Sequence, residues 1–192
     1  QMLFTKTKYR DIHHHLVSDC KNGDQKAQLE LYKLYHKAMY NSALRLLKNQ
    51  ADAEDVMQDS FIDAFARIDR LREDGSFGGW IKKIVINNAL DFLRNKKPTN
   101  ELDEVHTLLT DEQEISIEKD CRLEDIKKGM KMIKEEYRII LSLYLFEGYD
   151  HEEIASIENI SYGLSRTRYS RAKQSLLRAI HQMQTERATK WA

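Results

Sequence analysis

The sequence predicts an all-α protein made of two small helical domains joined by an acidic linker. The chain of 192 residues contains one proline and seven glycines, so few positions interrupt a helix. Apolar residues recur at helical spacing over several long stretches, and Val, Ile and Thr do not alternate as they would in strands. With 41% apolar and 32% charged residues, the chain can bury a core and is not expected to be disordered.

The first domain is predicted to span residues 1–97, with three main helices. The first helix covers about 24–48, and its apolar face consists of Leu31, Leu34, Tyr35, Ala38, Met39 and Ser42. The second covers about 52–70, with Asp52 as the predicted N-cap. Its buried stripe is formed by Met57, Phe61, Ala64, Phe65 and Ile68, and its opposite side by Asp52, Asp55, Asp59 and Asp63.

A polar, glycine-rich break, REDGSFGG at 72–79, precedes a third helix at about 79–96, which Pro98 ends. This helix is expected to bury Ile81, Val85, Ala89, Phe92 and Leu93. Its other side presents Trp80, Lys83, Asn87, Asn88, Asp91, Arg94 and Asn95. Asparagine, aspartate and arginine side chains suit base edges and phosphates, and exposed aromatics such as Phe77 and Trp80 can stack on unpaired bases. An ordinary solvated face, with Trp80 buried by a neighbouring helix, is the alternative.

Residues 98–116 lack regular periodicity and are acidic, which predicts a linker. The second domain is expected at 117–192. Helical pattern resumes near Ile117, with a break near Gly129, and runs to Phe146. The tract YRIILSLYLF at 137–146 is the most apolar in the chain and predicts a buried helix, with Gly148 just beyond its end. Two further helices, at 150–157 and about 162–184, form a helix-turn-helix.

The longer helix of this helix-turn-helix has the features of a DNA-reading helix. One narrow stripe packs, and consists of Ser165, Tyr169, Ala172, Leu176, Ala179 and Met183. The candidate DNA contacts outside it are Arg166, Thr167, Ser170, Arg171, Lys173 and Gln174. The segment 161–181 also holds Arg168 and Arg178, and it contains no acid. A helix that packs on one side and offers such groups on the other suits the major groove of DNA.

The charge of the chain is segregated although the formal net charge is zero. Segment 82–97 carries Lys82, Lys83, Arg94, Lys96 and Lys97 against the single acid Asp91. Segment 99–125 carries Glu101, Asp103, Glu104, Asp111, Glu112, Glu114, Glu118, Asp120, Glu124 and Asp125 against two cations. Two basic helices separated by an acidic stretch can bind a polyanion without a basic total.

The acidic side of the helix at 52–70 is either a solvated face or a docking surface. Ile62 lies among these acids, where an apolar side chain is not expected in water. An acidic surface with one apolar anchor can dock a basic partner helix. Asp55, Gln58, Asp59 and Ile62 are therefore the candidate protein-binding residues.

Other functional classes find little support in the sequence. No P-loop, HExxH or combination of Ser, His and acid indicates catalysis, and we expect no cofactor and no small-molecule substrate. The run His13, His14 and His15 cannot converge on one metal ion, so no metal site is expected. Cys20 and Cys121 are too few for a disulfide framework and are expected to be reduced thiols. Without an apolar run of about 20 residues or a signal peptide, the protein is expected to be cytoplasmic.

Five segments in this order resemble one protein family. They are GDQKAQLELYKLY (23–35), DAEDVMQDSFIDAFARI (52–68), SFGGWIKKIVINNALDFLRNKK (76–97), EEYRIILSLYLFEGYDHEEIA (135–155) and ISYGLSRTRYSRAKQSLLR (160–178). Together they resemble the bacterial RNA polymerase sigma factors of the extracytoplasmic-function (ECF) group.

The resemblance implies a role for each region. The segment 52–68 would dock on the clamp helices of the largest polymerase subunit, with Gln58 and Asp59 at typical contact positions. The segment 70–97 would recognise and help melt the minus-ten promoter element, and a loop there would capture a flipped base. The helix-turn-helix would bind the minus-thirty-five element and the flap of the second-largest subunit. The linker would thread toward the RNA exit path. Promoter DNA, core polymerase and a membrane-tethered anti-sigma factor are the implied partners.

The chain departs from the family pattern at two places, and other classes remain as alternatives. Gly163-Leu164 stands where the family often has Gly-Thr, which puts the transfer of any minus-thirty-five sequence preference in doubt. Ile133-Lys134 stands where the family often has Leu-Pro, which blurs a helix boundary. A dimeric DNA-binding regulator would not need Trp80, Phe77 or the acidic face. A nucleic-acid enzyme would need clustered metal-binding carboxylates, and an adaptor would not need the basic helix.

Overall fold

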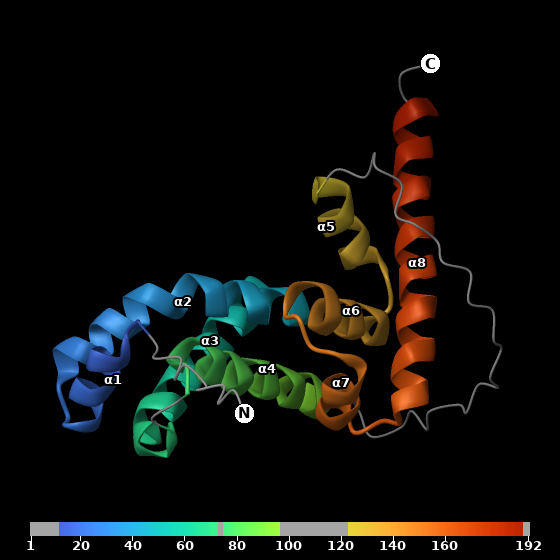
Figure 1. Ribbon diagram of the computed structural model, residues 1–192. Helices are drawn as coiled ribbons and strands as arrows, with labels where there is room; N and C mark the ends of the chain where they lie inside the picture. Colours follow the sequence, from blue (N-terminus) through green and yellow to red (C-terminus); the bar gives the residue numbers. More distant parts are fainter. Residues whose placement is uncertain (1–11, 73–74, 97–122, 190–192) are drawn as a thin grey trace, which may run out of the picture. The chain divides into compact units, whose positions relative to one another are not determined.

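The computed structural model describes residues 12–72, 75–96 and 123–189 (Figure 1). All regular elements in these ranges are helices, which confirms the predicted all-α class. The chain divides into two compact units, residues 1–99 and residues 100–192, called here the first and second unit. The predicted linker at 98–116 lies outside the described residues, so its boundaries stay predictions. No described helix is long and apolar enough to cross a membrane.

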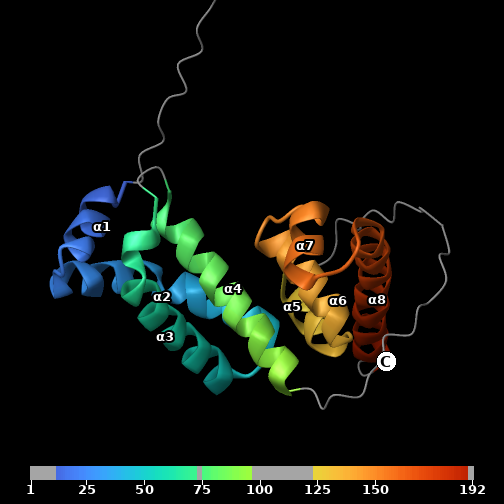
Figure 2. The ribbon, with the colours of Figure 1, turned by 90° about the horizontal axis from the view of Figure 1, so that it is seen from below.

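The first unit is built from α1 (His14–Lys21), α2 (Gln25–Leu47), α3 (Gln50–Ala66), the short 3₁₀ helix η1 (Ile68–Arg70) and α4 (Phe77–Lys96). Helices α2, α3 and α4 pack on one another, and α1 packs on α2 and η1 (Figure 2). Helix α1 was not predicted. It has only eight residues, and its three buried residues, Leu16, Val17 and Cys20, are too few to give a helical pattern in the sequence.

The boundaries of α2 and α3 are set by their caps. The Asp24 carboxylate accepts a hydrogen bond from Lys26 N at 2.8 Å at the start of α2. The prediction of Asp52 as the N-cap of the next helix is wrong, because α3 begins at Gln50 and the Asn49 side chain accepts from Asp52 N at 3.1 Å. Asp52 instead forms an ion pair with Lys96 of α4, at 3.0 Å.

The predicted apolar face of α2 is partly wrong. Leu31, Met39 and Ser42 are buried, but Leu34 is 51% exposed and Ala38 is exposed. The packed face of α2 consists instead of the buried residues Ala27, Leu31, Met39, Ser42, Ala43, Leu46 and Leu47. Both α3 and α4 lie against α2 along this side, so it is broader than one narrow stripe.

The second unit consists of α5 (Leu123–Met132), α6 (Glu135–Leu141), the π-helical turn η2 (Ser142–Phe146), α7 (His151–Glu158) and α8 (Tyr162–Thr189). Helices α5, α6 and α7 all lie on one side of the long helix α8 (Figures 1 and 2). The chain breaks at Ile133 and Lys134 rather than near Gly129. Gly129 lies inside α5, where the missing side chain lets this helix approach α8.

The most apolar tract is buried only in part. Residues 138–143 are buried, whereas Tyr144, Leu145 and Phe146 are 37–43% exposed. The exposed residues are the last three of η2, after its two buried residues Ser142 and Leu143. Gly148 follows with a φ of +78°, the left-handed conformation that glycine adopts easily after a helix end.

Candidate nucleic-acid interface and docking face

The helix-turn-helix is fixed by caps at both ends of its turn. Asp150 and Glu153 form a capping box at the start of α7. Asn159 ends α7 in a left-handed conformation, with φ of 55°. Ser161 Oγ accepts a hydrogen bond from Leu164 N at 3.1 Å, which satisfies one of the first amides of α8. The turn therefore has a defined geometry, and the start of α8 is held beside α7.

The packing side of α8 agrees with the predicted stripe in most positions. Ser165, Ala172 and Leu176 are buried, and Tyr169, Ala179 and Met183 are half-buried. Ile180, which the prediction left out, is only 2% exposed. Arg168 also belongs to this side, because its side chain is 13% exposed and its Nε lies 3.8 Å from Glu136 Oε2 of α6. Arg168 therefore braces the packing of α8.

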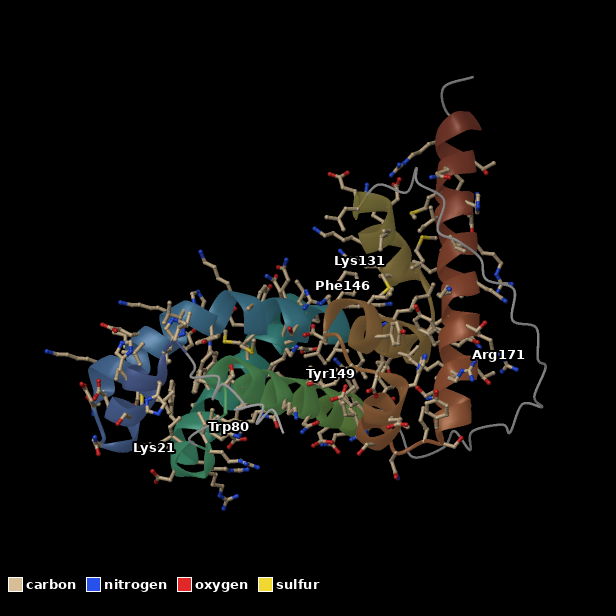
Figure 3. The ribbon with its side chains drawn as sticks, in the orientation of Figure 1. Lys21, Trp80, Lys131, Phe146, Tyr149 and Arg171 are labelled. Carbon is tan, nitrogen blue, oxygen red and sulfur yellow. The ribbon has the colours of Figure 1, made fainter. Side chains whose placement is uncertain are left out.

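The predicted DNA-contacting side chains lie around the rest of α8. Arg166 is exposed, and Thr167, Ser170, Arg171, Lys173 and Gln174 are half-exposed. Arg171 is on the side of α8 turned away from α5, α6 and α7 (Figure 3). Lys173 Nζ lies over the ring of Tyr169, 5.6 Å from its centroid, and Thr167 Oγ1 donates to the carbonyl of Gly163 at 2.9 Å. Cationic and hydroxyl groups thus share one accessible surface.

His151 is a titratable residue beside the start of α8 that the sequence analysis did not single out. It begins α7, and its ring is surrounded by Tyr144, Tyr162 and Tyr169. Burial lowers the pKa of His151 below its ordinary value of 6.5, the positive charge of Arg166 lowers it further, and Asp150 opposes the change. The imidazole is therefore neutral near pH 7.

This lowered pKa predicts that the second unit loses stability in acid. Well above pH 6.5 the imidazole is neutral in both states and adds no pH dependence. Below that value the unfolded chain binds a proton that the folded unit resists, so the free energy of unfolding falls until the pH passes the folded-state pKa. Denaturant unfolding at several pH values measures this fall. His151→Phe should remove part of it, and an identical pH profile in this variant would contradict the assignment.

The polar side of α4 in the first unit is the second candidate DNA surface. Lys83, Asn87, Asp91 and Arg94 are exposed, and Asp91 Oδ1 pairs with Arg94 Nη1 at 2.9 Å. Asn88 is half-buried, and its Nδ2 donates to Ser60 Oγ of α3 at 3.0 Å. That hydrogen bond commits one side of the Asn88 amide to the packing of α3 on α4.

The expectation that Phe77 lies exposed in a loop is wrong. It is the first residue of α4, and its side chain is 0% exposed. Its ring packs among Tyr35, Phe65 and Trp80. Trp80 is half-buried, at the end of α4 next to the glycine-rich break (Figure 3). Phe77 therefore supports the Trp80 ring, and Trp80 alone of this pair presents an accessible aromatic surface.

The acidic side of α3 is accessible as predicted from its pattern. Asp55, Gln58 and Asp59 are exposed, and Ile62 is 67% exposed. A single exposed isoleucine is common on protein surfaces, so it is the position of Ile62 beside exposed Asp55, Gln58 and Asp59 that suits a docking surface. Asp63, one residue further, is partly neutralised by Arg67 at 3.6 Å. Asp55, Gln58, Asp59 and Ile62 together form an exposed surface of two acids, one amide and one apolar side chain, called here the α3 acidic face.

In the part of the chain that the structure describes, no side chains are arranged for metal binding or for thiol chemistry. No cluster of three His, Cys, Asp or Glu side chains within it could hold a metal ion. Cys20 is buried, and burial together with Asp24 and Asp19 raises the pKa of its thiol to about 11. Such a thiol is protonated and unreactive at neutral pH. Cys121 lies outside the described residues.

Comparison with known proteins gives a consistent assignment for both units. Residues 31–99 match the family model described as Sigma-70 region 2, and residues 123–176 match the model described as Sigma-70, region 4. The ECF RNA polymerase sigma factor SigW of Bacillus subtilis is 26% identical, covering 87% of this chain and 96% of its own length. The RNA polymerase sigma-H factor of Pseudomonas aeruginosa is 27% identical, covering 89% and 95%. The ECF RNA polymerase sigma-E factor of Escherichia coli is 27% identical, covering 84% and 90%.

Two solved structures share the fold. CnrH, solved in complex with the cytosolic domain of CnrY, superposes with a TM-score of 0.56 at 19% identity, and covers 89% of this chain and 98% of its own. RpoE, solved with the anti-sigma factor NepR from Bartonella quintana, has a TM-score of 0.54 at 22% identity and covers 79% and 95%. At these identities the likeness concerns the arrangement of helices.

Proposed function

The chain belongs to the extracytoplasmic-function group of RNA polymerase sigma factors, non-enzymatic proteins that direct the polymerase to promoters, and we propose that it does so by recognising both promoter elements and assisting melting. In this proposal the second unit binds the minus-thirty-five element and α4 of the first unit the minus-ten element. Core polymerase docks on the α3 acidic face. The partners are core polymerase, promoter DNA and an anti-sigma factor, and the site of action is the cytoplasm.

The accessible surface of α8 carries this proposal. Arg166, Thr167, Ser170 and Arg171 are accessible at the start of a helix that a capped turn holds in place. In helix-turn-helix proteins this end of the second helix enters the major groove. An anti-sigma partner is supported by RpoE, which shares the fold and was solved bound to one.

Transcription in vitro tests the function as a whole. We expect core polymerase with this protein to start transcription at specific promoters of its source organism, and core polymerase alone not to do so. A protein that is folded by circular dichroism but gives no promoter-specific start on any fragment tried would refute the proposal. A dimeric regulator would bind duplex DNA without polymerase and would not redirect core enzyme.

The α3 acidic face predicts a specific defect in polymerase binding. The double change Gln58→Ala with Asp59→Lys replaces exposed groups, so the fold should persist. Charge reversal at a docking surface should cost about 1–3 kcal/mol of binding through lost complementarity and repulsion. Competition for core polymerase against the unaltered protein measures this cost. Glu30→Lys, a charge reversal at another exposed position on α2, is the control. Equal affinities for all three proteins would refute this docking face.

Arg166 and Arg171 are expected to bind promoter DNA in different ways. If Arg166 contacts a guanine edge, Arg166→Ala should cost about 1–3 kcal/mol and relax preference at one base pair. Arg171, farther from the start of α8, is expected to contact phosphate, so Arg171→Ala should weaken all sequences alike and lower the salt slope by about one. Holoenzyme binding to promoters with each base pair varied, at several salt concentrations, separates these effects.

Arg168→Ala is the matched control for that comparison. Arg168 is engaged with Glu136 and nearly buried, so its loss should affect the stability of the second unit more than base preference. Unchanged affinity and unchanged preference in Arg166→Ala would show that α8 is oriented differently on DNA.

A further inference from the structure

The two helices of the helix-turn-helix are joined by a polar contact inside an aromatic cluster. The His151 ring stacks on Tyr144 of η2 with centroids 4.8 Å apart, and meets Tyr169 of α8 edge-on at 5.3 Å. Tyr144 and Tyr169 also touch each other, at 4.5 Å. The ring of His151 is thus held from two sides, and its orientation is set by packing rather than by solvent.

Within this cluster, His151 Nδ1 lies 3.1 Å from Ser165 Oγ, a hydrogen bond between residues 14 positions apart. Ser165 is 0% exposed, so neither water nor DNA can reach its hydroxyl. A buried hydroxyl without a partner would be costly, and this contact satisfies it. The bond joins the first residue of α7 to the first turn of α8.

Arg166 directly follows Ser165, so the contact bears on the side chain proposed to read a base. Its positive charge is close enough to His151 to lower the pKa of the imidazole. Asp150, which caps α7, and the three tyrosines are further ionisable groups beside His151. Because the bond from His151 to Ser165 ties α7 to the first turn of α8, a tilt of α7 against α8 would move Arg166 relative to the rest of the unit.

We propose that His151 and Ser165 form a positioning contact that sets the direction of Arg166 and thereby the base preference of the helix-turn-helix. This inference rests on the proposed function. His151 acts through Ser165 and Arg166 and need not touch DNA itself. The consequence concerns specificity, because a small rotation of the first turn of α8 changes which base edge an arginine can reach.

Two variants remove the contact from opposite ends. His151→Phe keeps an aromatic ring among the tyrosines but has no hydrogen-bonding atom, and Ser165→Ala removes only a buried hydroxyl. Each is measured in the full chain bound to core polymerase, on promoters in which every base pair of the minus-thirty-five element is varied. Denaturant unfolding of each variant is measured separately, so that loss of folded protein is not mistaken for loss of preference.

We expect both variants to weaken binding to the preferred promoter roughly two- to tenfold, less than the loss of a full arginine–guanine contact, because Arg166 is misdirected but still present. Both should also reduce discrimination at the base pair that Arg166→Ala affects. The double variant should be no worse than either single one, because all three lack the same bond. Ser142→Ala is the matched control: this serine is also 0% exposed in the second unit, but its Oγ has no hydrogen-bond partner. It should leave base preference unchanged.

Several outcomes would overturn the inference. If His151→Phe weakens binding while Ser165→Ala does not, the imidazole contacts DNA directly and does not position α8. If both variants keep the full base preference, the contact is structural only. The unaltered protein is first tested for promoter-specific transcription with core polymerase. If it directs polymerase to no promoter, the proposed function is overturned rather than the positioning contact.

Discussion

Phe77→Ala is expected to lower the free energy of unfolding of the first unit by about 3–5 kcal/mol, the usual cost of removing a buried phenylalanine side chain. The ring is 0% exposed, and Phe65 stacks on it with centroids 6.1 Å apart. Tyr35 and Trp80 pack at 5.3 Å and 6.2 Å, so alanine would leave a cavity lined by three aromatic rings. Denaturant unfolding followed by tryptophan fluorescence measures the loss, since Trp80 lies beside the cavity.

Phe92→Ala provides the comparison, because Phe92 lies on the same helix but is only half-buried. It should cost clearly less than Phe77→Ala. Phe77→Leu separates a core role from a base-stacking role, since leucine fills most of the space but offers no aromatic face. If Phe77→Leu impaired promoter melting while Phe77→Ala left stability unchanged, the ring would belong to the DNA-binding surface and not to the core.

The helices and the helix-turn-helix could be predicted from the sequence, because each buries a face whose apolar residues recur at the helical period. Ser165, Ala172 and Leu176 lie on the packed side of α8 for this reason. The same reasoning failed for Leu34, since periodicity identifies an apolar face but not how many neighbours cover it. It failed for Phe77 as well, because a glycine-rich break gives no sign of whether the next aromatic turns inward.

The contact between His151 and Ser165 could not be predicted from periodicity, which says nothing about which polar side chains meet across two helices. One signal was nevertheless present in the sequence. Ser165 and Tyr169 are polar residues on the stripe that packs, and a buried hydroxyl needs a hydrogen-bond partner. That requirement points to a polar group on a neighbouring element, but the choice among candidates required the turn geometry set by Asn159 and Ser161.

Substitution of Gly129 is expected to cost the second unit almost as much as the loss of Phe77 costs the first. A Cβ atom at this position would lie 2.8 Å from Leu176 Cδ1 and 3.2 Å from Ile180 Cγ1. Both partners are buried on α8, so the larger side chain of Gly129→Leu must displace the Leu176 and Ile180 side chains or move α5 away from α8. Overpacking of this kind typically costs 1–3 kcal/mol, and we expect about 3 kcal/mol.

Any movement of α5 should also disturb the ion pair between Asp125 Oδ1 and Arg187 Nη1, which are 2.8 Å apart. Asp125 is nearly buried, so a weakened pair adds to the cost. Denaturant unfolding gives the total, and hydrogen exchange of the α5 amides shows whether this helix detaches first.

Gly163→Ala on α8 is the matched control for Gly129→Leu. No atom lies within 4 Å of its added Cβ, and its backbone is helical, so alanine should stabilise the unit by roughly 0.4–1 kcal/mol. Opposite signs for these two glycine substitutions would show that close packing of α5 on α8, and not helix propensity, determines the effect at Gly129. A Gly129→Leu protein that unfolds at the same denaturant concentration as the unaltered chain would mean that α5 does not approach α8 this closely.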